Sequence, residues 1–145
     1  MRMFEVYLGK INWVNPNVDR EHDEVLFQLE NYDSEHMPNW VYKRLQKLTD
    51  KRLFRSVVSK GKIKKMTRND VRGAGNTGDS WLYTLKWTEP EKSIRAKTLY
   101  GENKKVERPI YLHDPETGGI WLLGGHHRST YVTDVLKRPI EAIII

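Results

Sequence analysis

The sequence has no cysteine and no long apolar run. The absence of cysteine from the 145 residues excludes a disulfide framework, a cysteine nucleophile, an iron–sulfur cluster and a cysteine-built zinc site. No apolar stretch approaches the roughly 18–20 residues that cross a bilayer. The first residues also lack the apolar stretch and cleavage site of a signal peptide. We therefore expect a cytoplasmic, non-redox protein with no membrane partner.

The chain has enough apolar residues for one folded domain. Hydrophobic residues make up 38% of the sequence and aromatic residues 10%, which excludes a wholly disordered chain. A length of 145 residues suits a single domain, since single cores usually occupy about 100–200 residues.

Acidic residues are scarce in one segment, and this segment holds the basic excess. The formal net charge is +6, but residues 43–72 carry 12 basic and 2 acidic side chains, whereas residues 1–42 carry 3 and 8. Such a block attracts polyanions, because each Lys or Arg that meets a phosphate releases a counterion. A solvated helix face is the alternative interpretation. We predict that nucleic-acid backbone is contacted by five of these residues: Lys62, Lys64, Lys65, Arg68 and Arg72.

Apolar periodicity and turn residues predict the elements. A strand is expected over 4–13, followed by the Asn15-Pro16-Asn17 turn. Helices are expected over 20–31 with Asp19 as N-cap, over 38–48, and after Asp50 as N-cap. The glycine-rich tract 73–79 predicts a mobile loop. In the second half, strands are expected over 80–88, 94–100, 110–113, 120–123 and 140–145. One late helix is expected over 127–137.

The segment 120–130 carries the most informative pattern. An apolar strand runs into two glycines and then directly into the late helix, which lets backbone N–H groups approach an anion closely. His and Arg side chains add donors at the same point. We predict a phosphate site formed by Gly124, Gly125, His126, His127, Arg128, Ser129 and Thr130.

Two of these residues have predicted catalytic roles. His127 is the candidate general base, because histidine titrates near neutral pH. Arg128 is expected to stabilise charge on a reacting phosphate. The alternatives are that the histidines only cap the helix and that Arg128 forms a structural ion pair.

Residues 108–145 resemble the C-terminal part of the ParB amino-terminal domain and sulfiredoxin superfamily. The resemblance lies in a Pro-Ile strand, a hairpin, the Gly-Gly-His-His-Arg box at 124–128, a helix and a closing apolar strand. The box is similar to Gly-Gly-Cys-His-Arg of sulfiredoxins and Asp-Gly-His-His-Arg of free serine kinases. The resemblance implies an α+β fold with a small mixed sheet of ParB/sulfiredoxin type. Residues 1–145 would form one such domain, in which 37–107 is an inserted basic helical region.

The resemblance also implies a class of function. Members bind ATP, ADP or CTP phosphates at the box. Sulfiredoxin chemistry is excluded, because position 126 is His and the chain has no cysteine. The kinases have an acidic residue where this chain has Gly124. We therefore expect a nucleotide-phosphate-binding protein that acts on or near DNA, as a ParB-like nuclease or nucleoside triphosphatase using ATP or CTP with Mg²⁺.

Alternatives remain for the function and for the partners. One is a non-catalytic DNA-binding or regulatory module that uses the box to grip phosphate. Another is a small-molecule kinase of the free-serine kind. A protein partner bound through 37–107 is also compatible with the sequence. No metal ligand set is predicted, since the nearest carboxylates fit a turn or a helix surface: Asp114, Glu116 and Asp134.

Overall fold

The structure is a computed structural model that describes most of the chain. It covers residues 11–32, 35–76, 105–130, 132–133 and 137–145, without the side chains of His126 and His127. Four predictions lie wholly or partly outside these residues. They are the tryptophan hairpin (80–88 with 94–100), loop residues 77–79, most of the strand over 4–13 and part of the helix over 127–137.

A mixed four-stranded sheet forms the centre of the described structure. Its strand order is β2 (Lys62–Met66), β6 (Ile140–Ile144), β4 (Ile110–His113) and β5 (Ile120–Gly124). Strand β6 runs antiparallel to β2 and parallel to β4, and β4 and β5 form a hairpin. Helices combined with a mixed sheet confirm the predicted α+β class.

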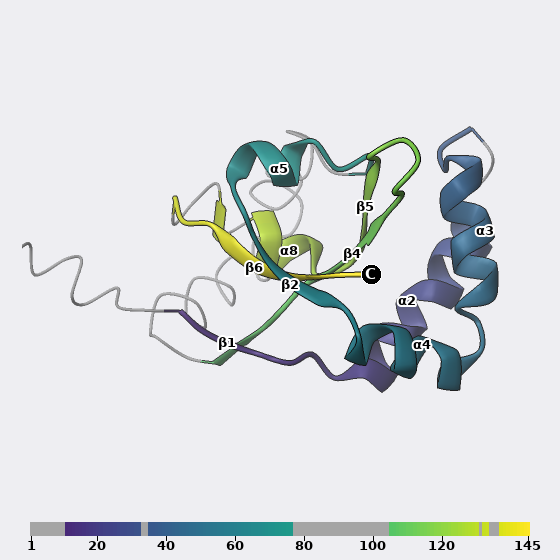
Figure 1. Ribbon diagram of the computed structural model, residues 1–145, viewed down its shortest axis with the longest axis horizontal. Helices are drawn as coiled ribbons and strands as arrows, with labels where there is room; N and C mark the ends of the chain where they lie inside the picture. The colour runs from purple at the N-terminus through teal and green to yellow at the C-terminus, as the bar shows by residue number, and fades with distance from the viewer. Residues whose placement is uncertain (1–10, 33–34, 77–104, 131, 134–136) are drawn as a thin grey trace, which may run out of the picture.

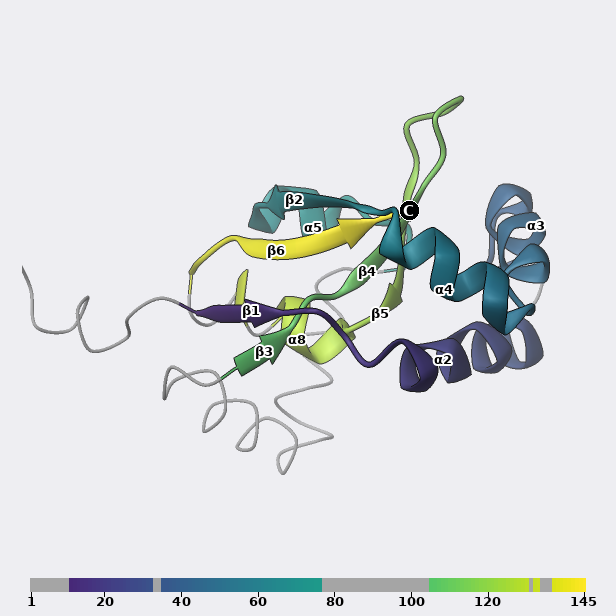
Figure 2. The same cartoon turned by 60° about the horizontal axis from the view of Figure 1, so that its bottom comes forward.

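A second, two-stranded sheet joins the early and late parts of the chain. Strands β1 (Asn12–Val14) and β3 (Lys105–Glu107) pair in parallel, and they lie side by side in Figure 2. Because β3 leads within a few residues into β4, this pair ties the chain that enters the first helix to the central sheet.

Three helices cover one face of the central sheet (Figure 1). They are α2 (Val18–Asn31), α3 (Asn39–Lys47) and α4 (Lys51–Ser59). Their apolar stripes pack on alternate residues of the strands, in a cluster that includes Val25, Val41, Leu45, Phe54, Leu112, Trp121 and Leu123. The region predicted to be an insertion therefore supplies much of this core, through α3 and α4.

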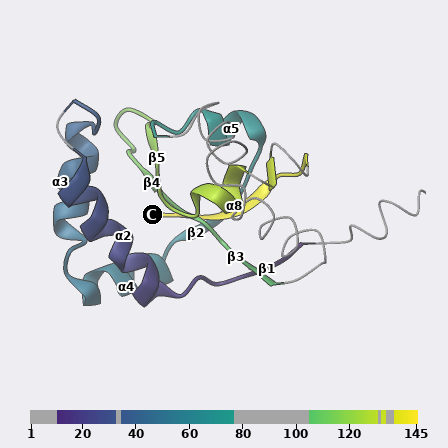
Figure 3. The same ribbon diagram turned by 180° about the vertical axis from the view of Figure 1, so that it is seen from behind.

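Two short helices lie on the other face, as Figure 3 shows from behind. They are α5 (Arg68–Arg72) and α8 (His126–Thr130). The opposite set of strand residues packs here, with Met66, Val71, Tyr111, Leu122, Val132, Ile140 and Ala142. The alternation of side chains along each strand thus gives the sheet two apolar faces. None of the helices in the described ranges has the length and apolar character needed to cross a membrane.

The helix caps confirm one prediction and correct another. Asp50 caps α4, because its Oδ1 accepts from the backbone N–H groups of Arg52 and Leu53. Helix α2 begins earlier than predicted, with Asn17 as its N-cap. Asp19 lies instead in the first turn, where its carboxylate pairs with Arg55 at 2.7 Å. Asparagine caps a helix as well as aspartate does, so Asn17 can serve as the cap. The Asp19 side chain is then oriented by its ion pair with Arg55.

The basic stretch after α4, which its composition predicts to be exposed, forms a strand. Residues 62–65 are exposed and lie on β2, at the edge of the sheet. Lysine is common on edge strands because its charge discourages pairing with another chain. The sequence 62–66 pairs with the apolar strand β6, and this pairing overrides the polar character of β2.

Candidate phosphate site

The predicted glycine box forms a tight turn between β5 and α8. Gly125 has a φ of 97°, a left-handed conformation that side-chain-bearing residues rarely adopt. A Cβ at this position would lie 2.7 Å from Pro109 Cβ and 2.8 Å from Arg128 Nη2. Gly125 is therefore required both by the backbone and by the guanidinium that lies over it.

Gly124 is required by a carboxylate from the opening helix. A Cβ on Gly124 would lie 2.2 Å from Oε2 of Glu21. Glu21 is only 5% exposed, so its carboxylate fills the space in which a side chain at 124 would stand. The carboxylate that lies against the box therefore comes from α2.

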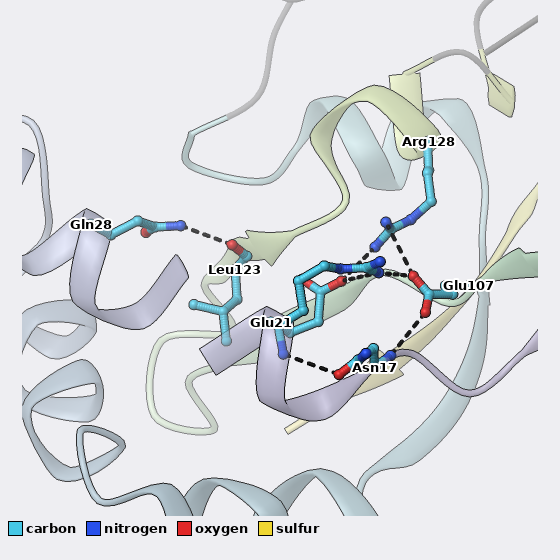
Figure 4. A network of polar contacts seen from close by, with 7 residues as sticks. Asn17, Glu21, Gln28, Glu107, Leu123 and Arg128 are labelled. Atoms are coloured by element: carbon cyan, nitrogen blue, oxygen red, sulfur yellow. Dashed lines mark hydrogen bonds and ion pairs between the residues drawn. The ribbon is translucent and has the colours of Figure 1, made fainter. Parts of the chain in front are cut away.

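Arg128 and Glu21 belong to a network of two arginines and two glutamates (Figure 4). Arg128 Nη2 lies 3.2 Å from Glu21 Oε1, and Arg128 Nη1 lies 3.9 Å from Glu107 Oε2. Arg20 Nη2 also contacts both carboxylates, with Glu21 Oε1 at 3.5 Å. The four charges balance, which offsets the cost of placing Glu21 out of water.

Hydrogen bonds to α2 and β3 hold these carboxylates in place. Gln28 lies two turns after Glu21 and donates from Nε2 to the Leu123 carbonyl at 3.0 Å, which fixes α2 on β5. The backbone N–H of Asn17 donates to Glu107 Oε1 at 2.9 Å, as Figure 4 shows. The Gln28 and Asn17 contacts thus orient both glutamates toward the guanidinium of Arg128.

One donor of Arg128 is unsatisfied within the described part of the chain. Its Nε is buried and has no hydrogen-bond partner there, although buried donors usually have one. The side chain as a whole is 17% exposed. The guanidinium is thus held through Nη1 and Nη2 by Glu107 and Glu21, while its Nε–H is left without a partner among the described residues.

Two hydroxyl residues of the box, Ser129 and Thr130, are buried. Ser129 is fully buried and Thr130 is 4% exposed. Ser129 Oγ accepts from Tyr111 Oη at 3.0 Å, and burial raises the pKa of the Tyr111 phenol. Both residues are buried where α8 packs against the sheet, and Ser129 joins α8 to β4 through its hydrogen bond with Tyr111.

The remaining box residues stay predictions. His126 and His127 begin α8, but their side chains lie outside the described part of the structure. The general-base role of His127 is therefore an expectation that rests on the sequence.

Of the carboxylates nearest to the box in sequence, Asp114 is held within the turn between β4 and β5. Asp114 accepts from the Glu116 backbone N–H and the Thr117 hydroxyl, and these bonds lower the Asp114 pKa, the Thr117 hydroxyl contributing most. Glu116 lies in the same exposed turn, and Asp134 is outside the described residues. Among those described, no group of three or more His, Cys, Asp or Glu side chains could hold a metal ion.

Sequence reasoning missed Glu21 and Glu107. Glu21 had one detectable signal: with Val25 and Gln28 it follows the i, i+4, i+7 spacing of the buried stripe of α2. A carboxylate in such a stripe is rare without a partner. Glu107 gave no such signal, because only the pairing of β3 with β1 brings it to this corner.

Glu24 lies one turn after Glu21 and is partly buried. Burial and, less strongly, the charge of Glu21 raise the pKa of Glu24 above its ordinary 4.5. The folded state then holds this proton to higher pH than the unfolded state, so the free energy of unfolding falls as pH rises from that ordinary value through the folded pKa.

We therefore expect Glu24→Gln to stabilise the protein near pH 7 by less than about 1 kcal/mol. Thermal unfolding of both proteins as a function of pH measures this, and the difference in Tm should vanish below the ordinary pKa. An unchanged Tm at neutral pH would contradict it.

The five predicted nucleic-acid contacts do not share one face. Lys62 and Lys64 alternate with Lys65 on β2, so they point to opposite sides of the sheet. Arg68 is exposed and Arg72 partly buried on α5. Only a ligand that wraps the edge of the sheet could contact all five.

No family model, curated protein or solved structure matches this chain. The resemblance to the ParB and sulfiredoxin superfamily therefore stays a prediction. The function proposed below rests on the geometry of the glycine turn and on the charges around it.

Proposed function

We propose that the chain binds the phosphates of a nucleotide at the Gly124–Gly125 turn and hydrolyses a phosphate ester there, on or near nucleic acid. The observation that carries this is the meeting of Arg128 with the buried Glu21 over the two glycines. Where a guanidinium and a carboxylate lie side by side, the guanidinium can bind a phosphate and the carboxylate can accept a proton next to it.

The roles follow from the charges. Arg128 binds the phosphate oxygens and stabilises the charge that grows on them during transfer. A phosphate must compete with Glu21 and Glu107 for this guanidinium, so binding releases at least one carboxylate contact. Glu21, once released, is placed to accept the proton of an attacking water.

Of the two carboxylates, Glu107 would hold a Mg²⁺ ion that binds with the nucleotide, because Glu21 is assigned the proton. Magnesium in phosphate sites is commonly held by one or two carboxylates together with substrate oxygens. Bound there, the ion would neutralise phosphate charge. ATP and CTP are the nucleotides we propose to test.

The experiment is a thermal-shift series with ATP, CTP and inorganic phosphate, each with and without Mg²⁺. We expect a bound nucleotide to raise the Tm of the native chain, because a ligand of the native state stabilises it by mass action. Arg128→Lys keeps the charge but loses the bidentate geometry, so it should reduce the shift and lower turnover about tenfold or more.

The matched control is Arg55→Lys on the exposed face of α4, which should keep the full shift. If neither nucleotide nor phosphate changes the Tm of the wild-type chain, the proposed function is wrong.

A second candidate function is nucleic-acid binding without catalysis. It is favoured by the exposed lysines of β2, with Lys62 and Lys64 on one side of the sheet and Lys65 on the other. This candidate replaces the first if no nucleotide raises the Tm or is hydrolysed while Lys64→Ala lowers DNA affinity and its salt dependence.

A further inference from the structure

Two adjoining cavities lie where β2 ends and β6 begins. Met66 pairs with Ile140, so the residues after β2 and those before β6 lie side by side. One cavity, of about 320 Å³, is lined by Thr67, Arg68, Thr133, Lys137, Arg138 and Pro139. The other, of about 410 Å³, shares Arg138 and Pro139 with it. None of these residues belongs to the glycine-turn network.

The first cavity has the lining of an anion site. It contains three cationic side chains and two threonines, and its described lining includes no carboxylate. Lys137 is exposed and has a φ of 58°, a conformation that costs lysine more than glycine or asparagine. Backbone strain of this kind is often retained where it positions a functional side chain.

The second cavity combines an aromatic ring with cations. It is lined by the partly buried Trp13, by Lys65 and by Arg138. Glu141 also lines it, but the Glu141 carboxylate accepts from Arg108 at 2.9 Å. Its negative charge is therefore already matched, which leaves a cationic rim around an apolar floor.

We propose that the two cavities together bind one nucleotide unit of a single-stranded nucleic acid. The phosphate lies in the first cavity between Arg68 and Lys137, and the base stacks on Trp13 in the second. Stacking platforms beside cationic grooves are the recurring means of binding single strands. A paired duplex keeps its base faces inside the stack, so it would not reach Trp13.

This inference takes one thing from the proposed function, namely that the partner is a nucleic acid. It changes the predicted interface. The contact is centred on the junction of β2 and β6, and it adds Trp13, Lys137 and Arg138 to the predicted Lys65 and Arg68. Lys137 and Arg138 lie 65 and 66 positions beyond Arg72, the end of the basic block, so the charge pattern along the sequence does not group them with it.

The test is fluorescence anisotropy of a labelled oligothymidylate of about 12 nucleotides with the full chain, between about 50 and 200 mM salt. Lys137→Asn removes the charge and tolerates the left-handed backbone. We expect it to weaken binding about fivefold and to reduce the salt slope by about 0.7. Trp13→Leu should weaken binding on the order of tenfold with little change in slope.

Matched controls separate the site from general effects. Lys47→Ala removes an exposed charge on α3, and Trp40→Leu removes a tryptophan that contacts the 114–119 turn. Both should leave affinity within about twofold of wild type. If Trp13→Leu lowers the Tm more than Trp40→Leu does, Trp13→Phe takes its place and should give a smaller loss of the same kind.

Two results would overturn the inference. One is that Lys137→Asn changes affinity no more than Lys47→Ala does. The other is that a duplex of the same length binds as tightly as the single strand, with no effect of the Trp13 variants. The nucleotide-induced rise in Tm should persist in Lys137→Asn. If the chain binds the oligonucleotide but no nucleotide, this result would therefore contradict the function proposed for the glycine turn and leave the present inference standing.

Discussion

Gly124→Ala should lower the free energy of unfolding by about 1–3 kcal/mol, the usual cost of forcing an extra methyl group into a packed site. The new Cβ would lie 2.2 Å from Glu21 Oε2, closer than real contacts allow. Glu21 is buried and held by Arg128 and Arg20, so the carboxylate cannot move aside without losing its ion pairs. To relieve the clash, α2, β5 or both would have to shift.

A double-mutant cycle tests this explanation. In a Glu21→Ala background the clashing oxygen is absent, so adding Gly124→Ala should cost far less than it does in the wild-type chain. Urea unfolding of the four proteins gives the coupling free energy, which we expect to be about 1 kcal/mol or more. Additive effects would show that Gly124 is required for a reason other than Glu21. Gly118→Ala is not a suitable control, since its φ of 75° adds backbone strain.

Arg128→Ala should destabilise the chain by about 3 kcal/mol, or roughly 10 °C in Tm, because it leaves a buried carboxylate short of its main partner. Among the described residues, Glu21 would then keep a single ion pair, with Arg20 at 3.5 Å, and the Arg20 side chain is itself 56% exposed. The loss should be partly restored by Glu21→Gln, which removes the buried charge that Arg128 balances. Thermal and urea unfolding of the single and double variants measure both effects.

The matched control is Arg55→Ala, which breaks the pair of Arg55 with Asp19. Those side chains are 54% and 53% exposed, so solvent already screens the pair and the free energy of unfolding should hardly change. If Arg128→Ala and Arg55→Ala have equal effects, the network around Glu21 does not stabilise the fold. The same preparations report function, since Arg128→Ala should show no rise in Tm with nucleotide at a temperature where it is folded.

The two predictions also separate stability from ligand binding. Glu21→Gln with intact Arg128 removes the competing carboxylate charge, so phosphate binding should tighten while any turnover that needs a proton acceptor at Glu21 falls. A structural ion pair alone would give neither change. The Glu21 variant therefore tests the assigned role in a way that unfolding experiments do not.

Local patterns along the chain predicted many of the elements that the structure describes. The short apolar runs predicted to be strands at 110–113, 120–123 and 140–145 correspond to β4, β5 and β6. The Asp50 cap and the 114–119 turn also depend on neighbours a few residues apart, as their hydrogen bonds show. Such features can be predicted because their energetics are set within a few residues.

Elements whose form depends on distant partners were harder to predict. The stretch 62–66 has an exposed, basic composition, yet it becomes a strand because β6 supplies an apolar, hydrogen-bonding neighbour. The helices before it are basic on one side, but their buried stripes complete the core over Leu112 and Trp121. The sequence alone indicated charge here and left the packing undetermined.

The sequence by itself determined the α+β class, the exclusion of cysteine chemistry and the glycine turn that ends in Arg128. Only the tertiary structure decided what Arg128 meets. Its partner Glu21 lies 107 positions away, and Glu107 joins them through the pairing of β3 with β1. Likewise, Arg68 lines one cavity with Lys137 and Arg138, and Lys65 lines another with Arg138, because β2 and β6 pair. Electrostatic interactions act through space, so residue spacing along the chain could indicate each group but not the sites they form together.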